Sequence, residues 1–160
     1  MKQRGFLNLA SGLLLALLLS TPGWGDEYVD PTFPQTDPTS VRGMHGCDEA
    51  HLAIGIHVGN NWLLCTSIFA TSQGAGSRLV DRGTVITLGG LSMHGCPFGT
   101  VIKAIDVRDN LLVCEQANID ESRAVADSGT RRNGMHACPL GMLMKGIHVD
   151  RDILACVPVR

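Results

Sequence analysis

The chain of 160 residues is poor in aromatic residues and carries no concentration of basic ones. Aromatics make up 4% of it, and 13 Lys and Arg stand against 15 Asp and Glu. Nucleic acids and anionic membrane surfaces are recognised through clustered Lys and Arg. The composition therefore argues against either of them as a partner.

The usual sequence patterns of catalytic sites are also lacking. There is no Gly-x-Ser-x-Gly, no His-Glu-x-x-His and no Cys-x-x-Cys. The Gly-rich segment Gly74–Ser77 is not followed by the Lys that a phosphate-binding loop requires. No Ser or Cys has an evident paired base. We therefore expect a protein that is not an enzyme.

Only one long apolar run occurs, at the start of the chain. Lys2 and Arg4 precede the run Leu7–Leu19, and a Gly-x-Gly segment ending at Gly25 suits a signal-peptidase site. The run is shorter than the roughly 20 residues that span a bilayer. We predict a cleaved signal peptide at residues 1–25, with an uncleaved anchor as the alternative, and hence a secreted or periplasmic protein with no membrane span.

Six cysteines follow the predicted signal, and their spacing is regular. They lie at Cys47, Cys65, Cys96, Cys114, Cys138 and Cys156, so the first and second, the third and fourth, and the fifth and sixth are each 18 residues apart. An even count of Cys in an exported chain indicates disulfides. The constant spacing predicts three local bridges, 47–65, 96–114 and 138–156, each worth roughly 3 kcal/mol through the loop that it closes.

The cysteine pairs belong to three similar segments. These read GMHGCDEAHLAIGIHVGNNWLLC, SMHGCPFGTVIKAIDVRDNLLVC and GMHACPLGMLMKGIHVDRDILAC. An Asp-x-Gly-Thr sequence precedes the second and third copies, and Asp37-Pro-Thr-Ser resembles it before the first. The first Cys recurs after 49 and then 42 residues, a period typical of repeat architectures.

Each copy has the pattern of a β-hairpin. In the third copy Leu143, Ile147 and Val149 alternate with other residues, which predicts a strand with one buried face. Asn and Asp then mark a turn before a short apolar return strand. The predicted fold is all-β, with three disulfide-closed hairpins in a β-trefoil-like or β-prism-like pseudo-threefold arrangement; a linear stack is the alternative. The predicted domain covers residues 43–160, with repeats at 43–66, 92–115 and 134–160, after a Pro-rich extended arm at 26–42.

The repeated Met-His pair is a candidate metal site. Three imidazoles suit zinc or copper, and a threefold axis could bring them together. The candidate ligands are His45, His94 and His136, and an alternative set on the hairpin strands is His57, Asp106 and His148. The competing interpretation is structural, with Met filling the core and His bonding a loop carbonyl.

The hairpin tips are the other candidate site. They carry polar residues and one aromatic: Asn60, Asn61, Trp62, Asp109, Asn110, Asp150 and Asp152. Repeated shallow sites suit a carbohydrate or a surface component, although few aromatics are available to stack on sugar rings. The sequence therefore favours a non-enzymatic binding module without a cofactor, whose ligand it does not identify, ahead of a copper or zinc protein and a purely structural protein.

Overall fold

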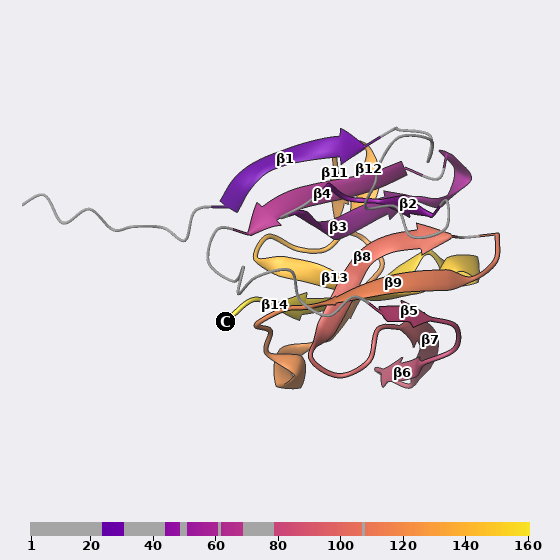
Figure 1. Ribbon diagram of the computed structural model, residues 1–160. Coiled ribbons are helices and arrows are strands. Elements are labelled where there is room, and N and C mark those ends of the chain that lie inside the picture. Colours follow the sequence, from indigo (N-terminus) through magenta and orange to yellow (C-terminus); the bar gives the residue numbers. More distant parts are fainter. Residues whose placement is uncertain (1–23, 31–43, 49–50, 61, 69–78, 107) are drawn as a thin grey trace, which may run out of the picture.

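The computed structural model describes residues 24–30, 44–48, 51–60, 62–68, 79–106 and 108–160, and shows an all-β chain (Figure 1). Only the backbone is described for residues 24–30 and for residue 68. Strand β1, Trp24–Asp30, begins two residues before the predicted mature start. The rest of the predicted signal peptide and residues 31–42 of the predicted arm lie outside the described residues.

The strands form three antiparallel sheets. The first has the order β1, β4 (Trp62–Ile68), β3 (His51–His57), β12 (Met135–Ala137), β11 (Arg131–Arg132). The second has the order β2 (His45–Gly46), β8 (Thr100–Asp106), β9 (Leu111–Gln116), β5 (Leu79–Asp81). The third has the order β10 (Val125–Asp127), β14 (Ile153–Pro158), β13 (Met142–His148), β7 (Leu91–Gly95), β6 (Val85–Leu88). Short 3-10 turns lie at Val58–Asn60, Glu121–Arg123 and Val149–Arg151.

Each sheet contains one hairpin closed by a disulfide. The hairpins are β3–β4, β8–β9 and β13–β14. The bridges are Cys47–Cys65, Cys96–Cys114 and Cys138–Cys156, which confirms the predicted pairing. A two-stranded hairpin is only marginally stable in water, so a bridge across its base and a further strand on each side stabilise it.

The prediction of one buried face per hairpin strand is wrong. In β13 the five residues from Leu143 to Ile147 are all buried. The pairing register shifts between Met144 and Gly146, and it shifts at the matching place in β3 and β8. Such a bulge breaks the alternation of side chains between the two faces. Met144 and Ile147 therefore join one apolar cluster while Leu143 joins another.

Short strands connect each copy to the hairpin of another. Strand β2, which carries the Met-His motif of the first copy, pairs with β8 of the second. In the same way β7 pairs with β13, and β12 pairs with β3, so the three joints form a closed cycle. The three histidines occupy matching positions, because each pairs with an Ile of its neighbour: His45 with Ile105, His94 with Ile147, and His136 with Ile56.

The joints are tightly packed, which explains the small residue between His and Cys in each motif. At one joint Gly46 faces Ala104, and a Cβ on Gly46 would lie 2.8 Å from that of Ala104. At another, a Cβ on Gly55 would lie 2.9 Å from Ala137 Cβ. No more than one methyl group fits between the paired strands at either place.

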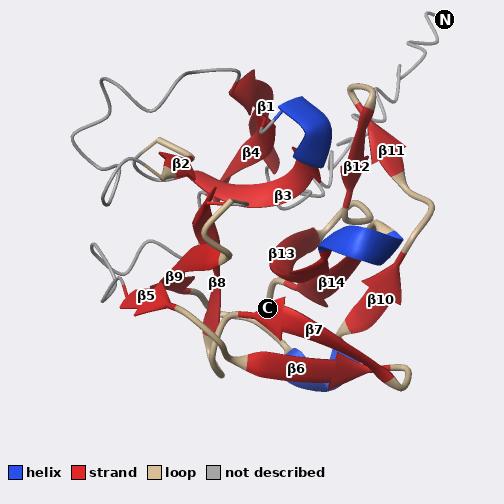
Figure 2. Cartoon of the chain, turned by 90° about the vertical axis from the view of Figure 1, so that its right-hand side faces the viewer, coloured by secondary structure: helices blue, strands red, loops and turns tan. Residues whose placement is uncertain are grey.

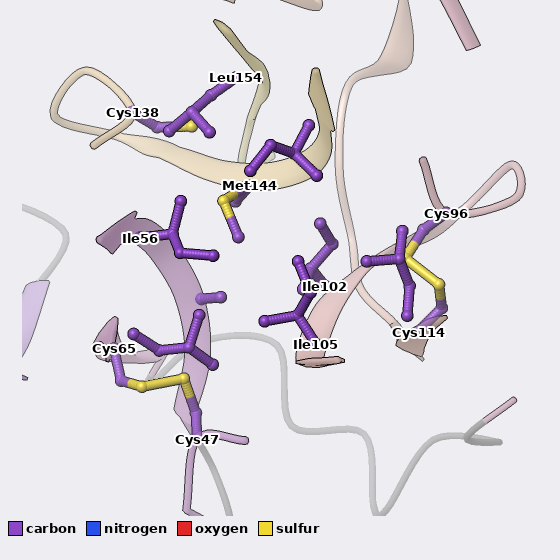
Figure 3. Packing of buried hydrophobic residues seen from close by; sticks show 14 of the residues in the cluster. Cys47, Ile56, Cys65, Cys96, Ile102, Ile105, Cys114, Cys138, Met144 and Leu154 are labelled. Carbon is purple, nitrogen blue, oxygen red and sulfur yellow. A yellow bond between two sulfur atoms is a disulfide. The ribbon is translucent and has the colours of Figure 1, made fainter. Parts of the chain in front are cut away.

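The main apolar cluster draws the same five positions from every copy. They are the two Cys, the residue six places after the first Cys, the Ile nine places after it, and the Leu of the return strand. Figure 3 shows Ile56, Ile105 and Met144 pointing toward one another from three hairpins, with two of the disulfides at the edge. Strands β3, β8 and β13 contact one another at this centre (Figure 2).

Two buried lysines link neighbouring copies. Lys145 is 4% exposed, and its Nζ donates to Pro97 O at 3.0 Å, Thr100 O at 3.2 Å and Glu121 Oε1 at 2.7 Å. Lys103, at the matching position of the second copy, donates to Asp48 O and His51 O. Each lysine thus holds the turn that enters the preceding hairpin. The matching residue of the first copy is Ile54, so the joint between the first and third copies has no such lysine.

Candidate functional site

His94 joins two sheets through its side chain. It lies in β7, and its Nε2 is 2.9 Å from Asp81 Oδ1 while its Nδ1 is 3.0 Å from Asn110 Oδ1. Asp81 ends β5 and Asn110 lies at the tip of the β8–β9 hairpin, both in another sheet. Because a carboxylate only accepts, Nε2 donates to Asp81.

His136 occupies the same place in the third copy but lies between two carboxylates. Its Nδ1 is 2.9 Å from Asp152 Oδ1, and its Nε2 is 3.2 Å from Asp127 Oδ1. The side chain is only 3% exposed. Both contacts are hydrogen bonds only when each ring nitrogen carries a hydrogen. Arg131 Nη2 lies 2.9 Å from the other oxygen of Asp152.

The Asp-x-Gly-Thr sequence forms the turn that orients the first of these carboxylates. Asp81 Oδ1 accepts from the backbone N–H of Gly83 and Thr84, and its Oδ2 accepts from Thr84 Oγ1 at 2.6 Å. Asp127 makes the same bonds to Gly129 and Thr130. Burial opposes ionisation of Asp81, but the bonds from Thr84, His94 and Gly83 outweigh it and lower its pKa to about 2.

Asp127 and Asp152 are ionised for similar reasons. Burial would raise the pKa of Asp127, yet the Thr130, His136 and Gly129 hydrogen bonds lower it overall. Burial acts likewise on Asp152, where His136 and Arg131 lower the pKa through hydrogen bonds and charge. The third copy therefore holds a compact set of paired charges around one buried imidazole.

The first copy has the same motif, but only part of its surroundings is described. Met44 and His45 are buried, at 1% and 4% exposure. By sequence position, the counterparts of Asp81 and Asn110 are Asp37 and Asn61, which lie outside the described residues. The Met residues of the other two Met-His motifs, Met93 and Met135, are also buried, as the structural interpretation predicted. The hydrogen-bond partners of His94 and His136, however, are side chains and not the loop carbonyls that we expected.

The candidate metal ligands lie on different sheets. His45 is in β2, His94 in β7 and His136 in β12, and the described part of the chain has no group of three or more His, Cys, Asp or Glu arranged to hold an ion. Both ring nitrogens of His94 and of His136 are already hydrogen-bonded. Metal ligation by either residue would require one of these bonds to break.

The alternative metal set lies at the ends of the hairpin strands, where two of its members support the tips. His57 Nδ1 accepts from the backbone N–H of Asn60 at 3.2 Å. Asp106 Oδ1 accepts from Asp109 N–H at 3.1 Å. His148, in contrast, makes no side-chain cap bond to the turn that follows it. At the two positions that make these bonds, the side chain closes the turn.

The candidate tip residues divide into two groups. Asn110 and Asp152 adopt left-handed backbone, with φ of 51° and 50°, and their side chains contact His94 and His136, although both tip residues remain exposed. Asn60, Asp109 and Asp150 are exposed, and Asn61 lies outside the described residues. Trp62 is 37% exposed, and its ring centroid lies 6.0 Å from that of His57.

Two hollows lie beside the histidines at matching places in the second and third copies. Their volumes are about 260 and 270 Å³. Five matching positions line both of them. In the second copy these are Val85, Ser92, Met93, His94 and Asn110; in the third they are Arg131, Gly134, Met135, His136 and Asp152. The match follows from the strand pairing, since Val85 faces His94 and Arg131 faces His136.

The two hollows differ in charge and in extent. At the shared positions the second-copy hollow has Val85 and Asn110 where the third-copy hollow has Arg131 and Asp152. The third-copy hollow also extends to the tip of the first hairpin, at His57 and its neighbours. The sequence alone did not point to Asp81, Asp127 or Arg131, although the repeated Asp-x-Gly-Thr was a usable signal.

Comparison of the chain with protein-family models, with curated proteins and with solved structures found no match. Within the described residues no helix is both long and apolar enough to cross a membrane. Three disulfides suggest an oxidising, extracellular type of environment.

Proposed function

We propose that this protein is an exported, non-enzymatic binding module with one ligand site in each repeat. The observation that carries the proposal is the pair of hollows at matching positions of the second and third copies. A catalytic site is usually built once and asymmetrically, whereas a repeated site favours binding. The binding sites lie beside the hairpin tips, between the tip residue and the Met-His strand.

The proposal includes a closed pseudo-threefold body of three disulfide-closed hairpin repeats, of the β-prism-like or β-trefoil-like kind. It is supported by the cycle of joints β2–β8, β7–β13 and β12–β3. The common core positions support it as well. A unit that cannot bury its apolar face alone needs its neighbours, and a closed ring leaves no copy without one.

In this arrangement the histidines support the sites without binding the ligand themselves. His136 is buried and both of its nitrogens are engaged, so it holds Asp152 at the wall of the hollow. His94 holds Asn110 in the same way. The residue paired with the histidine differs between the two copies, being Val85 in the second and Arg131 in the third. This residue therefore determines which ligand each hollow binds.

Amide NMR of the oxidised mature protein tests the proposal. The protein is titrated with a library of saccharides, small peptides and cell-surface fragments, and the shifted resonances are mapped. We expect shifts around the hollows, lost when Ser92→Tyr fills the second-copy hollow or Val149→Tyr fills the third. Gln116→Tyr, an exposed β9 position outside both linings, is the matched control.

Binding that maps elsewhere would overturn the placement of the sites. A bound compound that is recovered chemically changed would overturn the non-enzymatic assignment. If no member of the library shifts a resonance in either hollow, the purely structural interpretation takes the place of the proposal.

A further inference from the structure

The third-copy hollow offers donors and acceptors side by side at its wall. Arg131 Nη2 lies 2.9 Å from Asp152 Oδ2, and the two side chains are 49% and 52% exposed. The guanidinium carries five N–H groups, and each carboxylate oxygen has a second lone pair. The Arg131–Asp152 pair can therefore donate a hydrogen bond to one hydroxyl group of a ligand and accept one from the next, while the contact between the two side chains stays intact.

His57 supplies a further donor from the first copy. Its Nδ1 accepts the Asn60 N–H, so in the neutral ring the hydrogen is on Nε2. His57 and Gly59 line the hollow on the side of the first hairpin tip. A ligand in the hollow can thus be held from both the first and the third copies.

Apart from His136 and Gly134, the remaining residues that line the hollow are apolar. Val149 is 38% exposed, and the buried Met135 and Ile56 lie beneath. A volume of about 270 Å³ is just below the range of about 300–1,000 Å³ that is typical of sites for drug-sized ligands. The hollow suits one or two sugar rings, whose C–H faces would pack on the valine.

Charge decides between a neutral and an acidic ligand. Arg131 is compensated by Asp152, and Asp127 is a second carboxylate that contacts His136. An acidic group entering the hollow would meet the Asp152 carboxylate without gaining an unpaired cation. The hydroxyl groups of a neutral sugar match the pair without this repulsion.

We propose that the third-copy hollow binds a neutral saccharide, with the Arg131–Asp152 pair hydrogen-bonded to two adjacent hydroxyl groups and His57 hydrogen-bonded to a third. This inference rests on the proposed function and adds the ligand class. The second-copy hollow, with Val85 and Asn110 at the matching positions, binds the same sugars more weakly.

The site also bridges the joint that has no buried lysine. Its lining comes from residues 56–59 of the first copy and from residues 131–152 of the third, which meet through the β12–β3 pairing. A ligand that binds only the folded protein stabilises it. Sugar binding is therefore expected to raise the midpoint of thermal unfolding as well as to shift the amide resonances of Gly59 and Gly134.

The experiment titrates the oxidised mature protein with methyl mannoside, methyl galactoside and methyl glucoside, and in parallel with glucuronate, sialic acid and inorganic sulfate. Concentrations reach about 50 mM, well above a Kd of about 1 mM. The matched variants are Arg131→Val and Asp152→Asn, which install the residues that the second copy already carries. Each is expected to weaken sugar binding tenfold or more. The double variant Val85→Arg/Asn110→Asp should strengthen binding at the second hollow.

The outcomes separate this inference from the proposed function. If the acidic compounds or sulfate bind at Arg131 and the neutral sugars do not, the ligand class is wrong while the hollow stands as a site. If sugars bind and Arg131→Val changes nothing, the assigned contacts are wrong. If no compound shifts Gly59 or Gly134, the saccharide site is refuted, and the wider library decides whether the hollows bind anything else.

Discussion

Replacing Gly46 with alanine adds one methyl group where β2 meets β8. The new Cβ would lie 2.8 Å from Ala104 Cβ, whereas carbon atoms in contact prefer about 3.5–4.0 Å. Ala104 is 3% exposed, so the strand has little freedom to move aside. Overpacking of this kind costs about 1–3 kcal/mol. We expect a loss of that size in the free energy of unfolding of Gly46→Ala.

The second change, Ala104→Gly, removes the opposing methyl group. Alone it loses about 0.8 kcal/mol of burial and about 0.5–1 kcal/mol through the greater entropy of the unfolded chain. In Gly46→Ala/Ala104→Gly the methyl group has moved from one strand to the other. The β12–β3 joint already has this arrangement, with Ala137 facing Gly55. The double variant should lie within about 1 kcal/mol of the wild type, whereas the two single losses add to about 2–5 kcal/mol, so the coupling is about 1–5 kcal/mol.

Denaturant unfolding of the oxidised mature protein measures all three variants, and a change in midpoint at constant m-value reports stability. Gly83→Ala is the control, because a Cβ there meets nothing within 4 Å. It should change stability by no more than about 0.5 kcal/mol. The reasoning is refuted if Gly46→Ala is as stable as the wild type, or if the double variant is as unstable as the two single losses added together.

Three further predictions follow from the buried charges. Asp81 has a pKa of about 2 against its usual 3.8, so its ionised form contributes about 2 kcal/mol to the free energy of unfolding above pH 4. This contribution is lost as the pH falls through 2. Acid titration of Asp81→Asn should lack this loss of stability, and an unchanged acid limb of the stability profile would contradict the assignment. Lys145→Met removes the cation that pairs with Glu121 and one donor to each of the Pro97 and Thr100 carbonyls. It should cost about 3 kcal/mol, part of which Glu121→Gln restores; additive losses would contradict coupling between Lys145 and Glu121. Protein purified without chelator or affinity tag should carry no stoichiometric copper or zinc, because both ring nitrogens of His94 and of His136 are hydrogen-bonded. A stoichiometric metal that His136→Ala removes would show that His136 is a metal ligand.

Local features of the chain were readable from the sequence. The three disulfides each close a loop of the same length, and a hairpin brings its two ends together without help from distant residues. Asn110 and Asp152 mark the tips because their side chains tolerate left-handed backbone. The prediction of one buried face failed because a bulge changes which side chains point inward, and no alternation pattern reveals a bulge that is buried on both faces.

The sequence indicated only part of the candidate site. The repeated Met-His drew attention to His94 and His136, and both lie against hollows. Their partners Asp81 and Asp127 lie on other sheets, which the order of the residues alone does not bring together. The Arg131–Asp152 pair spans 21 residues and depends on the small β11–β12 hairpin reaching the third hairpin tip.

The sequence by itself determined the all-β class, the hairpins and their disulfides, because these depend on residues within about twenty positions of one another. Only the tertiary structure decided that each Met-His strand joins the hairpin of another copy, since that choice depends on which backbones can approach closely. Gly46 fits against Ala104, and Ala137 fits against Gly55, because each pair leaves room for a single methyl group. The same close approach places the tip of the first hairpin beside Arg131 and Asp152, and so creates the third-copy hollow.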